Sequence, residues 1–300
     1  MQTRRPPSPP EPASVLSVDV EDWFHILDIG GPAPGEWSAL PSHVERAFGK
    51  LLALLAAHRA RVTCFFLGWV AERFPHLVRE AAAAGHEIAS HGYAHRLAFE
   101  MSPEEFRADA ERARLVLEDL AAVPVAGYRA AGFSLTAGTP WFHEQLALAG
   151  YRYDSSLFPA PRGHGGMRDG RMDPYRIDLP SGRTMVEFPI TVVNVLGRRL
   201  CFFGGGYLRL SPYWLLKRMG RRVLAGGRPL VFYVHPREVD PTVPRLPMPF
   251  HRRFKSYVNV RGTDRKIAKL LRDFPVVPFR DLLARYETRE GTPEGAPGAR

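Results

Sequence analysis

The chain has 300 residues, of which 45% are apolar and 24% are charged, enough to bury a large core in one domain. Its formal net charge of +10 comes from scattered arginines without a long basic run, which argues against a nucleic-acid-binding protein. Cys64 and Cys201 lie far apart in the sequence, so a disulfide framework is not indicated.

The two ends of the chain differ in composition from the part between them. Residues 1–13 and 287–300 are rich in Pro, Gly, Glu, Thr and Arg and lack apolar periodicity, so we expect a disordered arm and a disordered tail. Residues 14–286 are expected to fold as a single domain. We find no apolar stretch that suits a signal peptide or a transmembrane segment, so the sequence predicts a cytoplasmic protein.

Short apolar runs alternate with helical patterns through the predicted domain. Amphipathic spacing and capping residues predict helices that begin near Ser42, Pro75, Ser102 and Thr139. Strands that alternate with helices form parallel sheets, so we expect an α/β fold, an irregular (β/α)7-type barrel with its active site at the C-terminal ends of the strands. The expected strands are residues 13–20, 61–67, 86–90, 125–129, 151–154, 184–189 and 229–235.

The pattern weakens between residues 156 and 228, where Gly, Pro and Arg are frequent. We interpret this stretch as long active-site loops of the same domain.

Three carboxylates lie close together at the end of the first expected strand, at Asp19, Glu21 and Asp22. Strand alternation puts Asp19 and Glu21 on one face. Clustered carboxylates repel one another unless a cation or a shared proton relieves them, so this motif indicates a metal site or an acid–base site. The alternative is a solvated turn in which Asp22 caps a helix.

Two histidines, His91 and His95, follow the third expected strand four residues apart. Imidazoles at this spacing can share one cation. With a carboxylate as third ligand they favour Zn²⁺, and Co²⁺, Mn²⁺ and Ni²⁺ remain alternatives because spacing does not identify the metal. His86 stands at the beginning of the same strand, so we expect it to form a local hydrogen bond instead.

These motifs together resemble the polysaccharide deacetylase superfamily of the carbohydrate esterase family 4 type. Residues 202–260 resemble the C-terminal extension of deacetylases from exosortase (PEP-CTERM) exopolysaccharide loci, so residues 156–286 are expected to include that extension. The resemblance implies removal of acetyl groups, chiefly N-acetyl groups, from a polysaccharide or its precursor in exopolysaccharide biosynthesis. The matching segments are residues 19–23, 63–66, 86–95, 127–133, 153–159 and 231–236.

The resemblance implies a metal site with one bound divalent ion. Glu21, His91 and His95 would be the ligands, with an open position for water and for the substrate carbonyl. The family commonly has two adjacent aspartates in its first motif, whereas Val20 follows Asp19 here. The carboxylate ligand must therefore be Glu21 or, as the alternative, Asp22.

The resemblance also implies the catalytic groups. Asp19 would be the general base, held by a bidentate contact from Arg129. His235 would be the general acid, oriented by Asp154. The remaining implied site residues are Gly132 and Phe133 as backbone oxyanion donors, and Trp23, Phe133 and Tyr207 as walls of the sugar site.

Ala131 stands where the third motif usually has proline, which puts the geometry of the oxyanion donors in doubt. Two further hypotheses stay open at this point. One is an amidohydrolase of the same superfamily that acts on a cyclic imide or a ureide, and the other is a catalytically silent carbohydrate-binding protein. The expected partner is an acetylated glycan, without nucleic acid, and the sequence does not determine the oligomeric state.

Overall fold

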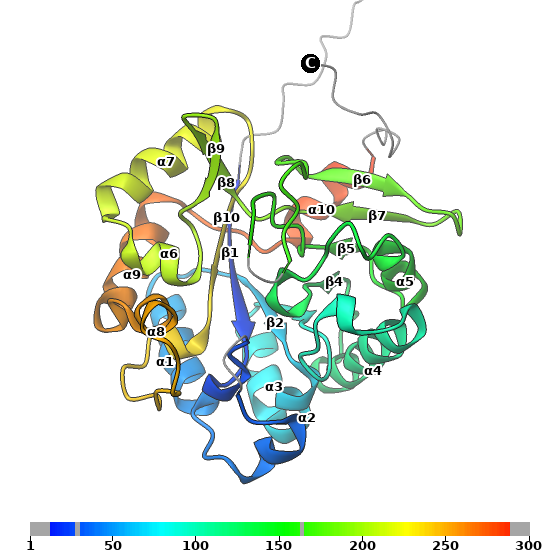
Figure 1. Cartoon of the computed structure of the whole chain (residues 1–300), viewed down its shortest axis with the longest axis horizontal. Coiled ribbons are helices and arrows are strands. Elements are labelled where there is room, and N and C mark those ends of the chain that lie inside the picture. Colours follow the sequence, from blue (N-terminus) through cyan, green and yellow to red (C-terminus); the bar gives the residue numbers. More distant parts are fainter. Residues whose placement is uncertain (1–12, 28–30, 163–164, 289–300) are drawn as a thin grey trace, which may run out of the picture.

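The computed structural model describes residues 13–27, 31–162 and 165–288 (Figure 1). The predicted disordered arm and tail therefore lie outside the described residues, apart from Ala13, Glu287 and Thr288. Within these ranges, no helix has both the length and the apolar composition needed to cross a membrane.

Eight strands form one curled, open sheet in the described part of the chain (Figure 1). Their order is β10-β1-β2-β3-β4-β5-β7-β6, and every neighbouring pair is parallel except β6 and β7. Each of the seven predicted strands is found in this parallel part, which confirms the α/β fold of the (β/α)7 type. The strands are β1 (Ser14–Val20), β2 (Thr63–Phe66), β3 (Glu87–Ser90), β4 (Gly127–Tyr128), β5 (Tyr153–Asp154), β6 (Tyr175–Asp178), β7 (Thr184–Glu187) and β10 (Leu230–Val234).

Helices cover the outer face of the sheet and follow its strands in chain order (Figure 1). The helix predicted from Ser102 is confirmed together with its capping box, in which Ser102 and Glu105 each accept a backbone N–H of the other. The helices are α1 (Val44–Ala57), α2 (Gly68–Arg73), α3 (Pro75–Ala83), α4 (Pro103–Ala121), α5 (Phe142–Leu148), α6 (Gly205–Leu210), α7 (Tyr213–Ala225), α8 (Phe250–Tyr257), α9 (Thr263–Asp273) and α10 (Arg280–Glu287).

Alternation along β1 separates two apolar layers. Leu16, Val18 and Val20 belong to the core between the sheet and the helices. Val15 belongs instead to a second cluster inside the curl of the sheet, together with Phe65 and other interior residues. Because side chains alternate, Asp19 shares the interior face with Val15, which directs its carboxylate to the inside of the half-barrel.

The prediction of long loops between residues 156 and 228 is wrong outside the expected strand at residues 184–189, which is β7. The stretch also forms β6, a separate hairpin of β8 (Val192–Val195) and β9 (Arg198–Cys201), and helices α6 and α7. Strands β6, β8 and β9 have only four residues each, too few to show a clear alternation among glycines and arginines. Helix α7 does have apolar residues at helical spacing, and Leu216, Met219 and Val223 are buried. The many Gly and Arg residues around them made this pattern hard to recognise in the sequence.

Contrary to the prediction, Ser42 is not the N-cap residue of helix α1, but its Oγ accepts the N–H of Val44 in the first turn, and a distant carboxylate completes the cap. The N-cap position of α1 is His43, which makes no side-chain cap bond. The carboxylate of Asp22 instead accepts hydrogen bonds from the backbone N–H groups of His43 and Val44 and from Ser42 Oγ. The segment after β1 is thereby tied to the start of α1.

Candidate active site

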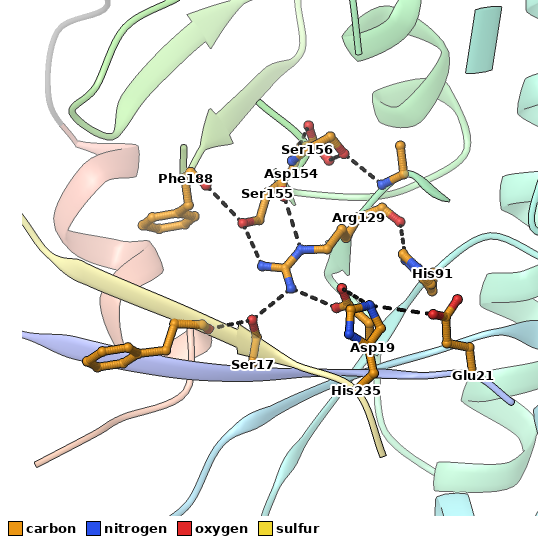
Figure 2. Close-up of polar contacts among 12 residues, drawn as sticks. Ser17, Asp19, Glu21, His91, Arg129, Asp154, Ser155, Ser156, Phe188 and His235 are labelled. Atoms are coloured by element: carbon orange, nitrogen blue, oxygen red, sulfur yellow. Dashed lines mark hydrogen bonds and ion pairs between the residues drawn. The ribbon is translucent and has the colours of Figure 1, made fainter. Parts of the chain in front are cut away.

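The C-terminal ends of three strands bring five of the predicted catalytic and metal-binding residues together in one pocket. Figure 2 shows four of them, Asp19, Glu21, His91 and His235. Asp19 and Glu21 come from the end of β1, His91 and His95 follow β3, and His235 follows β10. The pocket is partly open to solvent.

Glu21, His91 and His95 form a buried group whose ligand atoms all lie within 4.8 Å of one another and could hold a metal ion. Glu21 Oε2 lies 2.7 Å from His95 Nε2 but receives no hydrogen bond from a described residue. A buried carboxylate oxygen without a donor is costly unless a cation compensates it. This donor set of two imidazoles and one carboxylate fits a catalytic Zn²⁺ site.

His91 is held in the form that a metal ligand needs. Its Nδ1 lies 2.8 Å from the carbonyl oxygen of Arg129, which can only accept a hydrogen bond. The proton therefore resides on Nδ1, and Nε2 keeps its lone pair for coordination. Burial lowers the pKa of His91 to about 4, so its imidazole is neutral near pH 7.

Glu21 has a second contact that the sequence did not indicate. Arg237 Nη1 forms an ion pair with Glu21 Oε1 from the short helical turn Pro236–Glu238. Burial acts to raise the pKa of Glu21, but the positive charge of Arg237 and the proximity of His95 outweigh it and hold that pKa well below its usual value. Glu21 is therefore a carboxylate at neutral pH.

Asp19 is paired with Arg129, as predicted, but through one guanidinium nitrogen. Arg129 Nη1 lies 2.7 Å from Asp19 Oδ1 and also donates to Ser17 Oγ (Figure 2). Arg129 Nε and Nη2 donate to the carbonyl and hydroxyl oxygens of Ser155 instead. The predicted bidentate contact is thus wrong, because the guanidinium spans strands and joins β1 to the chain after β5. The guanidinium also lies 4.2 Å from the ring of Phe65.

His235 faces the two carboxylates of β1 and is oriented by a neighbour in sequence. Its Nε2 lies 3.5 Å from Glu21 Oε1 and 3.9 Å from Asp19 Oδ2. Its Nδ1 lies 2.5 Å from Glu238 Oε1. Burial raises the pKa of Glu238, but Arg209 and His235 outweigh it and lower that pKa to about 2, so Glu238 is a permanent acceptor.

The prediction that Asp154 orients His235 is therefore corrected. Asp154 accepts hydrogen bonds from the backbone and hydroxyl of Ser156, and its Oδ2 lies 3.6 Å from His143. His143 in turn lies 3.1 Å from Glu187. Asp154 thus lies toward α5 and β7, away from the pocket. The buried group of His143, Asp154 and Glu187 also has a geometry that could hold a metal ion.

The turn Ala131–Phe133 borders the pocket although Ala131 replaces the usual proline. Gly132 and Phe133 both have left-handed backbone angles, with φ of 63° and 57°. The N–H of Phe133 donates to the carbonyl of Ala130, which favours the N–H of Gly132 as the oxyanion donor. Phe133 and Tyr207 line the pocket, as expected for walls of a sugar site.

Trp23 does not line the pocket. Its ring is buried in a satellite cluster with Phe24 and Trp37, and its Nε1 donates to the carbonyl of Pro41. The interpretation of Trp23 as a wall of the sugar site is therefore wrong. His86 accepts a hydrogen bond from the N–H of Val62 through Nδ1, which confirms the local role that we expected.

Several residues of the pocket were not predicted from the sequence. His25 accepts the N–H of Asp22 through Nδ1, and its Nε2 is buried without a hydrogen-bond partner among the described residues. Glu238 could have been noticed, because it follows His235 by three residues at the end of a strand. Arg237 could not, because nothing in the sequence separates it from the many other arginines. The cationic residues that line the pocket are Arg162, Arg209, Arg237, Arg252 and Lys255.

Comparison with known proteins gives two family matches that meet near residue 154. The polysaccharide deacetylase family matches residues 39–153, and a domain of unknown function (DUF3473) matches residues 155–284. Strands β7 and β10 of the second segment belong to the same sheet as β1 to β5. Over 72 residues the chain is 35% identical to a peptidoglycan-N-acetylglucosamine deacetylase of Bacillus cereus, a match that covers 24% of this chain and 26% of that protein.

Solved structures share the fold. The structure of a proposed polysaccharide deacetylase from Mycobacterium smegmatis matches 99% of this chain and 97% of its own, with a TM-score of 0.64 and 22% identity. An allantoinase structure matches 94% of both chains, with a TM-score of 0.60 and 18% identity. The fold is thus common to proteins named for different reactions. By these matches, residues 39–153 resemble the polysaccharide deacetylase family and residues 155–284 resemble the DUF3473 domain.

Proposed function

We propose that this protein is a metal-dependent deacetylase that removes N-acetyl groups from a polysaccharide or its precursor, in exopolysaccharide biosynthesis. The observation that carries the proposal is the placement of a carboxylate, Asp19, and an imidazole, His235, at one pocket beside the trio of Glu21, His91 and His95. The name of the Bacillus cereus relative supports an N-acetylated sugar as the substrate. Zn²⁺ is the metal that we propose, for its preference for such ligands.

Glu21, His91 and His95 would hold the metal ion. The chemistry it supplies there is polarisation of the acetyl carbonyl and a lower pKa for a nearby water, as in other hydrolases of this kind. Asp19, which its ion pair with Arg129 fixes in place, then accepts a proton from the attacking water. The N–H of Gly132 donates to the oxygen of the tetrahedral intermediate.

His235 completes the reaction by donating a proton from Nε2 to the leaving nitrogen as the C–N bond breaks. The carboxylate of Glu238 holds Nδ1–H and stabilises the protonated ring. Water and the amide thereby become acetate and a free amine. In this assignment the base and the acid come from the ends of two adjacent strands, β1 and β10.

Acetate release from a panel of acetylated glycans, with and without a chelator, tests the proposal. We expect release that the chelator abolishes and that added Zn²⁺ restores. His91→Ala and His95→Ala should lose both metal and activity, whereas the control His86→Ala, in the same segment but outside the pocket, should keep both. Hydrolysis of a cyclic imide or ureide without acetate release would contradict the proposal and favour an amidohydrolase.

A further inference from the structure

The pocket has more positively charged side chains than carboxylates to pair with them. Its three carboxylates each have an arginine of their own: Asp19 pairs with Arg129, Glu21 with Arg237 and Glu238 with Arg209. Three further cations, Arg162, Arg252 and Lys255, line the same pocket, and Arg252 donates to the carbonyl of Leu27. Neither Arg162 nor Lys255 forms an ion pair with a carboxylate of the described residues.

Arg162 is held with part of its hydrogen-bonding capacity unused. Its guanidinium lies 4.8 Å from the ring of Phe133 and 5.0 Å from the ring of Phe158, which fixes the plane of the group. Its Nη1 is buried and has no hydrogen-bond partner among the described residues. A buried charged donor without an acceptor is destabilising, and an anionic oxygen of a ligand would satisfy it.

Lys255 offers a second positive charge from another part of the wall. It comes from α8, a helix without fully buried residues, and its Nζ lies 4.5 Å from the ring centre of Tyr207. The same Nζ donates to the hydroxyl of Tyr207 at 3.2 Å. Tyr207, itself a pocket residue, therefore keeps the ammonium group at the pocket while leaving its charge uncompensated.

We propose that the pocket binds an acetylated sugar that carries an anionic group, a carboxylate or a phosphate, through Arg162 with assistance from Lys255. Arg162 suits this role because its planar fork matches the geometry of both groups. It packs on Phe133, whose turn borders the proposed acetyl site, so the anionic group would lie on the acetylated sugar or on its direct neighbour. This inference rests on the proposed deacetylase function and specifies its substrate class.

Three probes distinguish the sources of the negative charge: a tetrasaccharide that alternates N-acetylglucosamine with glucuronate, N-acetylglucosamine 1-phosphate, and neutral chitotetraose. For the wild-type holoenzyme we expect kcat/KM to be highest for one or both anionic probes. Arg162→Gln and Lys255→Gln should lower kcat/KM for the preferred anionic probe by about tenfold or more and leave chitotetraose within about twofold. Arg162→Lys should retain part of the preference.

Two residues that pack against aromatic rings outside the pocket serve as matched controls. Arg171 lies 4.6 Å from the ring of Tyr175, and Lys269 lies 5.5 Å from the ring of Tyr213. Arg171→Gln and Lys269→Gln should leave the preference for the anionic probe unchanged. Equal losses on anionic and neutral probes in Arg162→Gln would overturn the proposal, because they would mean that Arg162 only supports the turn.

Calorimetric binding of the same probes separates this inference from the proposed reaction. Acetate release with equal rates and equal affinities for anionic and neutral probes would overturn the anionic site and leave the deacetylase intact. Binding of an anionic probe that Arg162→Gln weakens, without acetate release from any probe, would support the anionic site and remove the deacetylase function. If no probe binds and no acetate is released, both the anionic site and the deacetylase function are overturned.

Discussion

At the scale of single residues, the site gives different tasks to carboxylates that are close in sequence. Asp19 faces Arg129, whereas Glu21 faces two histidines and Arg237. Asp22 is turned to the start of α1. These surroundings follow from the alternation of β1 and from the turn after it, and they separate the proposed base, the proposed ligand and a helix cap within four positions.

Exchange of the first two carboxylates for amides should therefore have different effects. We expect Asp19→Asn to retain the metal and lose most of its turnover, because an amide cannot accept the proton. Glu21→Gln should lose the metal, since a neutral amide is a weaker ligand than a carboxylate. Metal content by elemental analysis and acetate release measure the two effects. Metal loss in Asp19→Asn with full retention in Glu21→Gln would reverse the assignment.

The role of His235 can be separated from metal binding. His235→Ala should keep its metal and lower turnover of an N-acetyl substrate by about 10²-fold or more, because an amine leaves poorly without a proton. An activated aryl acetate has a good leaving group and should lose far less. Rates on both substrates test this difference. Equal losses on the two substrates, or loss of the metal, would show that the general acid is another residue.

At the scale of elements, the turn after β1 is fixed by the helix that it caps. Asp22 accepts the N–H of Trp23 at the start of a short helical turn, and it also accepts N–H groups of α1. A helix begins with N–H groups that have no partner in the helix, so a carboxylate there is stabilising. The position of Glu21 in the pocket thus depends on α1 as well as on β1.

Removal of this cap should cost stability without affecting the metal. Asp22→Ala is expected to lower the free energy of unfolding by about 1–2 kcal/mol, the usual cost of a lost N-cap, and to retain the metal. Urea denaturation and elemental analysis provide the two measurements. Ser102→Ala removes the N-cap of α4, far along the chain, and serves as a control of similar kind. Metal loss without a loss of stability would identify Asp22 as the ligand.

At the scale of the whole molecule, a buried charge cluster joins the two family segments. His143 on α5 contacts Asp154 at the end of β5 and Glu187 at the end of β7. Burial lowers the pKa of His143, but its hydrogen bonds to Asp154 and Glu187 outweigh this effect and raise that pKa to about 10. A charged His143 is thus part of the folded protein at neutral pH.

This cluster predicts a decline of stability in alkaline solution. The folded protein keeps the His143 proton up to a pKa of about 10, whereas the unfolded chain releases it near pH 6.5. Its contribution is therefore complete below pH 6.5 and is lost as the pH rises to about 10. His143→Gln should flatten this decline in denaturation series between pH 6.5 and 10. His76→Gln, which removes an exposed pair with Glu45, should leave the decline as it is.

The sequence by itself determined the seven parallel strands and the candidate residues Asp19, Glu21, His91, His95 and His235. These signals are local, because apolar period, capping residues and motif spacing are all properties of adjacent positions. The sequence also indicated a resemblance to the polysaccharide deacetylase family, and residues 39–153 match the model of that family.

Only the tertiary structure decided which side chains meet. Glu238, and not Asp154, orients His235. Arg129 donates hydrogen bonds both to β1 and to the chain after β5, and Arg237 forms an ion pair with Glu21. Such contacts join residues up to 216 positions apart, and they depend on the curl of the sheet and on the direction of each turn. Local sequence patterns carry no information on these pairings, because an arginine can pair with a carboxylate on the surface or with a buried one, and its sequence neighbours do not show which.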